Sequence, residues 1–183
     1  KVGLRATFMP KPFIDKTGNG CHAHLSIWNK KGKNLFLDKK DKLGLSKTAY
    51  NFMGGIMNSA EALTAWFNPT TWSPNTITYS GNNRTHMIRV PGSGRFELRL
   101  MDGATNPYLL QAGIIAAGLD GLDKKRNPGK PINLNMYKDA HKVKGAKKLP
   151  LTLQSALNNL NKSKILKSAF GKDVINSYIT LKN

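Results

Sequence analysis

Residues 85–100, THMIRVPGSGRFELRL, decide how this chain is organised. Two β-prone runs, 85–90 and 95–100, flank a proline- and glycine-rich turn at 91–94. Short runs rich in β-branched and aromatic residues, separated by such a turn, are typical of paired antiparallel strands. A third β-prone stretch at 76–80 precedes them, so the sequence predicts an antiparallel meander.

The second of these runs has one charged face. Strand periodicity places Arg95, Glu97 and Arg99 on the same side, with apolar residues between them on the other. A guanidinium grips a carboxylate or phosphate with two parallel hydrogen bonds, so this face suits an anionic ligand. The alternative is a solvent-facing row of ion pairs, which are common and contribute little. Arg84 and Arg89 are five residues apart, which predicts that one of them lies at a strand end or bulge.

A second alternating stretch lies upstream, at 21–28. Its period of two places His22, His24, Ser26 and Trp28 on one face and apolar residues on the other. Neutral imidazole is a common metal ligand, but an ordinary half-buried strand face would show the same alternation. A turn containing Gly18 precedes this stretch, and glycine allows the backbone to approach a ligand closely.

The rest of the chain predicts helices around the sheet. Ser46 is placed to cap a helix, because apolar residues follow it at helical spacing. Asn106 and Pro107 form the start of a second helix, whose residues 109–122 are apolar nearly all round and should be buried. A strand at 2–9, a basic loop from 124 and two amphipathic helices at 151–160 and 163–181, interrupted near Gly171, complete the predicted elements. Strands and helices in this order predict an α+β domain.

Composition limits the function classes. The chain has 183 residues, with Lys+Arg 29 against Asp+Glu 10 and a net charge of +19. That length predicts one domain, or one large part of one. No apolar run approaches the roughly 18 residues of a spanning helix and no leader is visible, which predicts a cytoplasmic protein without membrane contact. A single cysteine, Cys21, excludes an internal disulfide. The opening Lys1 predicts a fragment of a longer product. The excess of lysine leaves open a basic nucleic-acid-binding module, although scattered lysines fit that class poorly.

Four motifs in order resemble the catalytic domain of the glutamine synthetase family. They are Phe8-Met9-Pro10-Lys11-Pro12, Gly18-Asn19-Gly20-Cys21-His22-Ala23-His24-Leu25-Ser26, Asn83-Arg84-Thr85-His86-Met87-Ile88-Arg89-Val90-Pro91, and Arg95-Phe96-Glu97-Leu98-Arg99 followed by Asp102-Gly103-Ala104-Thr105-Asn106-Pro107-Tyr108. The third and fourth motifs are most similar to the branch that includes γ-glutamylmethylamide synthetase.

The resemblance implies a fold and an activity. It implies that residues 1–183 are a C-terminal catalytic domain, with a curved antiparallel sheet backed by helices. It also implies an ATP-dependent ligase that joins glutamate to ammonia, or to a small amine such as methylamine, through γ-glutamyl phosphate. Mg²⁺ or Mn²⁺ would be the cofactor, and the whole protein would form a ring-shaped homo-oligomer.

The resemblance also assigns roles to individual residues. The implied metal ligands are His22 and Glu97; the ATP contacts are His24, Ser26, Arg89 and Arg95; the glutamate contacts are Gly18, Arg84 and Arg99; and the catalytic arginines are Arg84 and Arg89.

Three departures from the family pattern lead us to expect that the chain alone is inactive. The family takes most of its metal-binding glutamates from an upstream segment that this sequence lacks. It also has an N-terminal β-grasp domain that nothing here can form. Finally, residues 68–71 run directly into 72–75 without the family's Tyr-Lys-Arg stretch and flexible loop, so one glutamate-binding arginine is missing.

Overall fold

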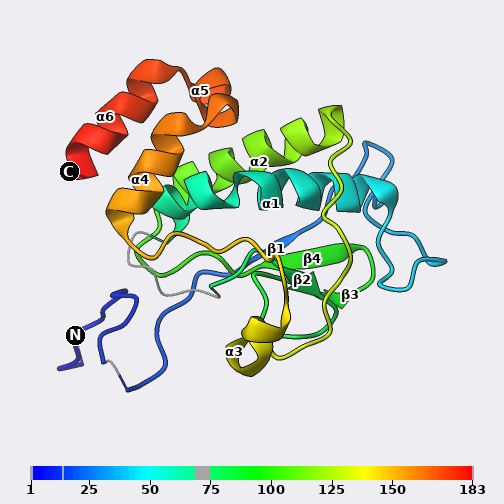
Figure 1. Ribbon diagram of the computed structural model, residues 1–183, viewed down its shortest axis with the longest axis horizontal. Coiled ribbons are helices and arrows are strands. Elements are labelled where there is room, and N and C mark those ends of the chain that lie inside the picture. Colours follow the sequence, from blue (N-terminus) through cyan, green and yellow to red (C-terminus); the bar gives the residue numbers. More distant parts are fainter. Residues whose placement is uncertain (1, 14, 69–74, 183) are drawn as a thin grey trace.

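Four short strands form the sheet that carries most of the charged residues discussed above. The computed structural model describes residues 2–13, 15–68 and 75–182. The strands are β1 (Ala23–Leu25), β2 (Tyr79–Ser80), β3 (Ile88–Gly92) and β4 (Arg95–Leu98), in the spatial order β1-β4-β3-β2. Helices α1 (Lys47–Phe67) and α2 (Pro107–Asp123) lie on one side of this sheet (Figure 1). The predicted α+β class is confirmed.

The sheet is mixed, which corrects one prediction. Strands β3 and β4 pair antiparallel as expected, with a register shift between Arg89 and Gly92. Strand β2 pairs with β3 in parallel, so 76–100 is not an antiparallel meander. The cause is the connection at 81–87, which is too long and irregular for a tight hairpin. Its turn is held by Asn83, whose side chain accepts hydrogen bonds from both the amide and the hydroxyl of Thr85.

Helix α1 forms the centre of the core. Its cap is the predicted one, because the Ser46 hydroxyl accepts a hydrogen bond from the Ala49 amide at 3.2 Å. Its inner face buries Phe52, Met53 and Ile56 among the apolar residues of β3 and β4. The helix therefore supports the sheet from behind and leaves the opposite face of the strands for polar side chains.

Helix α2 begins at the predicted cap but is less buried than expected. The Asn106 side chain accepts hydrogen bonds from the second and third residues after it, and Pro107 is the first helical residue. Ile115 and Leu119, however, are 55% and 50% exposed. The prediction of burial all round was wrong because the contacts of α2 with α1 and α5 (Lys164–Phe170) bury one face, which includes Leu110, Ile114 and Ala117, and leave the other exposed.

The two ends of the chain differ in how well they match prediction. No strand forms within 2–13, where Val2, Leu4 and Phe8 are exposed, because this segment pairs with no strand in the described parts of the chain. The C-terminal helices are confirmed as α4 (Leu153–Lys162), α5 and α6 (Lys172–Lys182), with Gly171 between the last two. The short α3 (Met136–Asp139) and η1 (Ala140–Lys142) interrupt the predicted basic loop. In the described ranges, every helix is too short or too polar to cross a bilayer.

Candidate functional site

Glu97 lies at the centre of the sheet's polar face. It occupies β4, which has β3 on one side and β1 on the other, and its Cα partners are Arg89 and His24. Cross-strand partners project to the same face of a sheet. The apolar neighbours Phe96 and Leu98 point into the core on the other side and are fully buried. The alternation in the sequence therefore fixes which face carries the charge.

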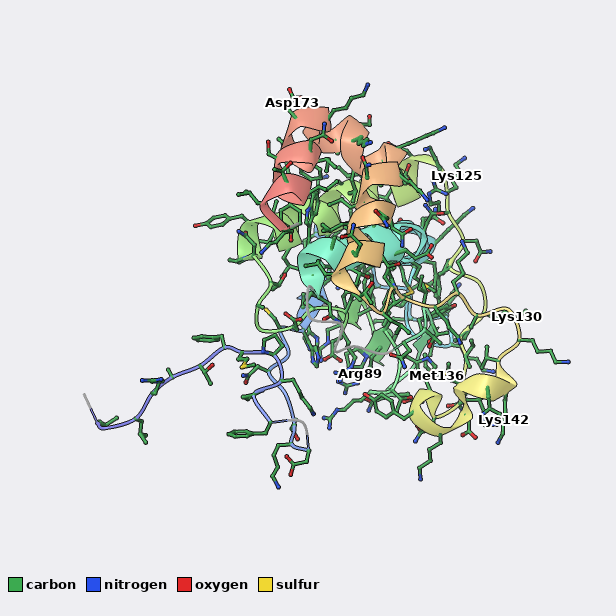
Figure 2. All side chains as sticks on the ribbon, turned by 60° about the vertical axis from the view of Figure 1, so that its left-hand side comes forward. Arg89, Lys125, Lys130, Met136, Lys142 and Asp173 are labelled. Atoms are coloured by element: carbon green, nitrogen blue, oxygen red, sulfur yellow. The ribbon has the colours of Figure 1, made fainter. Side chains whose placement is uncertain are left out.

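Two arginines hold the Glu97 carboxylate from opposite sides. Arg89 Nη1 donates to Oε2 at 2.9 Å, and Arg99 Nη1 donates to Oε1 at 2.8 Å. The side chain of Glu97 is 5% exposed, and those of Arg89 and Arg99 are 15% and 14% exposed. This burial rules out the alternative of a solvent-facing row of ion pairs. We refer to Arg89, Glu97, Arg99 and the adjacent His22 as the Glu97 cluster; Figure 2 labels Arg89.

His22 belongs to the cluster as a neutral imidazole. Its Nδ1 lies 3.1 Å from Arg99 Nη1 and 3.3 Å from Glu97 Oε1. Burial lowers the pKa of His22, the positive charge of Arg99 lowers it further, and the opposing effect of Glu97 is smaller. A neutral ring whose Nδ1 accepts from Arg99 fits this geometry better than an imidazolium paired with Glu97.

Two residues that the sequence analysis did not assign help to place the cluster. The Asn82 side chain accepts a hydrogen bond from Arg89 Nε at 2.7 Å, which orients that guanidinium toward Glu97. A Cβ added to Gly20 would lie 2.8 Å from His22 Nε2, so glycine leaves room for the imidazole. The only sequence signal for Asn82 or Gly20 was a run of turn-forming residues. Such a run does not indicate which side chains the turn positions.

The other predicted site residues lie around the cluster without joining its contacts. His24 shares the face of Glu97 by strand register and is exposed. Arg95 is exposed at the start of β4, and the Ser26 hydroxyl accepts a hydrogen bond from Trp28 at 2.9 Å. Gly18 precedes β1 in an exposed segment, and a Cβ there would lie 2.2 Å from the Pro10 carbonyl oxygen.

Arg84 and Arg89 lie in different elements, as their spacing of five residues predicts. Arg84 is exposed in the turn before β3, whereas Arg89 lies within β3 and joins the cluster. The predicted absence of a loop concerns residues 69–74, which lie outside the described residues.

Acid should weaken the fold through Glu97. Burial by itself would raise the pKa of this carboxyl group, but the hydrogen bond from Arg89 and the charges of both arginines outweigh it and lower the pKa. A carboxyl with a lowered folded pKa stabilises the fold above its unfolded pKa of about 4.3, and that contribution is lost as pH falls through the folded value. Urea unfolding of the wild type and Glu97→Gln should therefore show a stability gap at pH 7 that closes at low pH. A gap independent of pH would contradict the charged pairing.

The residues that the structure describes do not form a complete metal site. His22 and Glu97 bring one nitrogen and one oxygen donor together, but both carboxylate oxygens and Nδ1 already contact arginines. Within the described ranges, no group of three or more His, Cys, Asp or Glu side chains could hold a metal ion. Divalent cations usually need more ligands than this pair supplies. The pair can contribute to a site only if further ligands come from elsewhere.

Comparison with known proteins gives matches over the whole chain. The family model described as "Glutamine synthetase, catalytic domain" matches residues 1–183. A glutamine synthetase of Rhizobium meliloti is 53% identical over all of this chain and 46% of its own length. A glutamate–methylamine ligase of Methyloversatilis universalis is 43% identical, again over all of this chain and 46% of its own. The chain thus spans about half the length of the curated relatives it matches.

Solved structures show the same fold. One described as "Apo GmaS without ligand" is 51% identical, with a TM-score of 0.92 over 98% of this chain and 44% of its own. Another, "GmaS/ADP complex-Conformation 1", is 49% identical with the same TM-score. The alignment with the Rhizobium meliloti protein extends over 199 positions against 183 residues here, a difference of 16. The matched region is therefore shorter in this chain than in that relative.

Proposed function

Because this chain belongs to the glutamine synthetase family, we propose that it is the C-terminal catalytic part of an ATP-dependent ligase that joins glutamate to ammonia. The Glu97 cluster carries this proposal. It presents two largely buried guanidiniums beside an imidazole and a carboxylate on one sheet face. Such a face can neutralise the charge that phosphoryl transfer places on oxygen atoms.

The proposed reaction has two steps. In the first, a γ-carboxylate oxygen of glutamate attacks the γ-phosphorus of ATP, the bond to ADP breaks, and γ-glutamyl phosphate forms. In the second, ammonia attacks the activated acyl carbon, phosphate leaves, and the nitrogen gives up one proton to become the neutral amide. Phosphoryl transfer needs little covalent help from the protein, so its residues act by positioning and by charge.

We assign roles to residues in keeping with their positions. Arg89 and Arg95 would contact the phosphates of ATP, with His24 and Ser26 on the neighbouring strand as further nucleotide contacts. Arg99 would pair with a carboxylate of glutamate. Arg84 would reach the transferred phosphoryl group from the turn before β3, and Gly18 would place backbone near glutamate.

The divalent metal on which this family generally depends would neutralise phosphate charge when bound. His22 and Glu97 would supply two of its ligands, and the remainder would have to come from parts of the protein outside this chain. We therefore expect the chain alone to lack ligase activity. Ring-shaped assembly is likewise a proposal for the whole protein.

A second candidate differs only in the amine. The match to a glutamate–methylamine ligase, 43% identical, favours methylamine, whereas the match to a glutamine synthetase, 53% identical, favours ammonia. Nothing in the Glu97 cluster discriminates between NH₃ and CH₃NH₂, because both are small neutral nucleophiles. Comparison of kcat/KM for the two amines, measured on the full-length protein, would decide between them.

The nucleotide half-site can be tested on this chain by calorimetry. We expect ATP to bind, and Arg95→Gln to weaken binding about tenfold, as loss of one charge-assisted contact should. Arg5→Gln, which removes the same charge from the exposed N-terminal segment, is the matched control and should leave binding unchanged. Mg²⁺ should strengthen ATP binding by the wild type but not by Glu97→Gln. Equal effects of the two arginine substitutions would overturn the assignment.

A further inference from the structure

A second basic site lies at the other edge of the sheet from His22. A hollow of about 580 Å³ is lined by α1, by the 124–132 segment that follows α2, and by residues 143–147. It adjoins β2, whereas His22 immediately precedes β1 at the opposite edge of the sheet. The volume falls in the range of small-molecule sites, roughly 300–1,000 Å³. The hollow is therefore large enough for a ligand and distinct from the Glu97 cluster.

The lining of this hollow is strongly cationic. Among the described residues, the lining contains no carboxylate and five basic side chains: Lys124, Arg126, Lys130, Lys144 and Lys147. Asp120 lies behind them and pairs with Lys124 at 2.8 Å and with Arg126.

Three of the five lysine and arginine charges remain unneutralised. In the part of the chain that the structure describes, no carboxylate lies within 4.0 Å of the Lys130, Lys144 or Lys147 ammonium groups. Figure 2 shows a further lysine, Lys125, on the same side of the molecule as Lys130. Clustered like charges around a concavity raise the local concentration of anions.

Residues 143–147 and 124–132 form the two basic walls of the hollow. Both walls are hydrogen-bonded to the extended segment 77–79. The Ile77 amide donates to the Lys147 carbonyl at 2.9 Å, which holds the 143–147 wall. The Tyr79 hydroxyl donates to the Gly129 carbonyl at 2.8 Å, and the Ile132 amide donates to the Tyr79 carbonyl at 3.0 Å. These bonds hold the opposite wall, so the site is largely formed before any ligand arrives.

The floor of the hollow depends on one glycine. A Cβ added to Gly54 in α1 would lie 2.6 Å from the Arg126 carbonyl oxygen. Glycine here lets the 124–132 segment pack directly on the helix backbone. The positive charges are thereby brought close to α1 instead of projecting freely into solvent.

We propose that this hollow binds a small phosphate-bearing anion with at least two negative charges. Ammonium groups are common phosphate ligands. They act as point charges and, unlike the planar guanidinium, do not require the phosphate oxygens to lie in a fixed plane. A single nucleic-acid strand fits less well, since such strands stack their bases on aromatic side chains. Among the described lining residues, Tyr79 is the one aromatic side chain, and its hydroxyl already supports the wall. The proposal does not rest on the ligase function.

Calorimetric titration of this chain with inorganic pyrophosphate, without metal, tests the site. We expect binding that the double variant Lys144→Gln/Lys147→Gln weakens about tenfold or more, because two charge-assisted contacts are lost. The control is Lys164→Gln/Lys172→Gln, which removes the same charge from exposed positions on α5 and α6 and should bind like the wild type. Far-UV circular dichroism should show both variants folded.

Competition with pyrophosphate distinguishes which class of phosphate-bearing molecule the hollow binds. AMP should displace pyrophosphate from the wild type, whereas a single-stranded RNA oligonucleotide should not displace it at matched phosphate concentration. The proposal is overturned if pyrophosphate fails to bind, if the pocket variant binds as tightly as the wild type, or if both double variants weaken binding equally. The last result would indicate diffuse attraction to a basic surface. ATP binding that depends on Arg95 would be unaffected by any of these outcomes.

Discussion

Gly55→Ala is expected to lower the free energy of unfolding by about 3 kcal/mol, the upper range for overpacking a well-filled core. The added Cβ would lie 2.0 Å from the Ala117 carbonyl oxygen and 2.7 Å from backbone atoms of Gly121. All of these contacts are with the backbone of α2, so no side chain can rotate away and the helices must separate. Alanine has a higher helix propensity than glycine by about 1 kcal/mol, which offsets only part of the cost.

Urea unfolding followed by circular dichroism measures this effect. Gly92→Ala is the matched control, because Gly92 is exposed and a Cβ there would meet nothing within 4 Å. We expect that control to unfold close to the wild-type midpoint. If Gly55→Ala also unfolded at the wild-type midpoint, the close approach of α1 and α2 would not be a determinant of stability.

Glu97→Gln is expected to destabilise the chain at pH 7 by about 3 kcal/mol, as removal of one partner of a buried ion pair generally does. The change leaves Arg89 and Arg99, both largely buried, without the carboxylate that lies between them. Glutamine keeps the volume of the side chain, so the loss measures charge and not packing.

A double-mutant cycle of Glu97→Gln with Arg89→Gln measures the coupling energy between these two side chains. Because each single change leaves a buried group uncompensated, the double variant should be less destabilised than the two single effects added together. Asp139→Asn is the control, since its partner Lys142 at 2.7 Å is exposed and such pairs contribute little. Strict additivity of Glu97→Gln and Arg89→Gln would show that the 2.9 Å contact carries no coupling energy.

The sequence was sufficient for elements whose signals are local. The caps at Ser46 and Asn106, the break at Gly171 and the hairpin around 91–94 follow from side-chain chemistry within a few residues. Alternation in 95–100 also determined that Glu97 and the core residues face opposite ways. Four ordered motifs added the family, which no periodicity could have shown.

Features that depend on distant partners could not be predicted in this way. The parallel pairing of β2 depends on the path of 81–87, and the exposure of Ile115 depends on which sides of α2 have neighbours. The failure of 2–9 to form a strand has the same cause, because an extended segment becomes a strand only when another strand supplies its hydrogen bonds.

Part of the Glu97 cluster could be predicted from the sequence, and part of it required the tertiary structure. The sequence by itself determined that Glu97 and Arg99 share a strand face, because the period of two is a property of the extended backbone. Only the tertiary structure decided that Arg89 and His22 complete the cluster, since strand register and the room left by Gly20 bring them there. The same holds for the basic hollow. The sequence shows that the chain is rich in lysine, but it does not show that these lysines line one cavity. They do so because residues 124–132 and 143–147, which are far from 77–79 in the sequence, are both hydrogen-bonded to that segment in the folded chain.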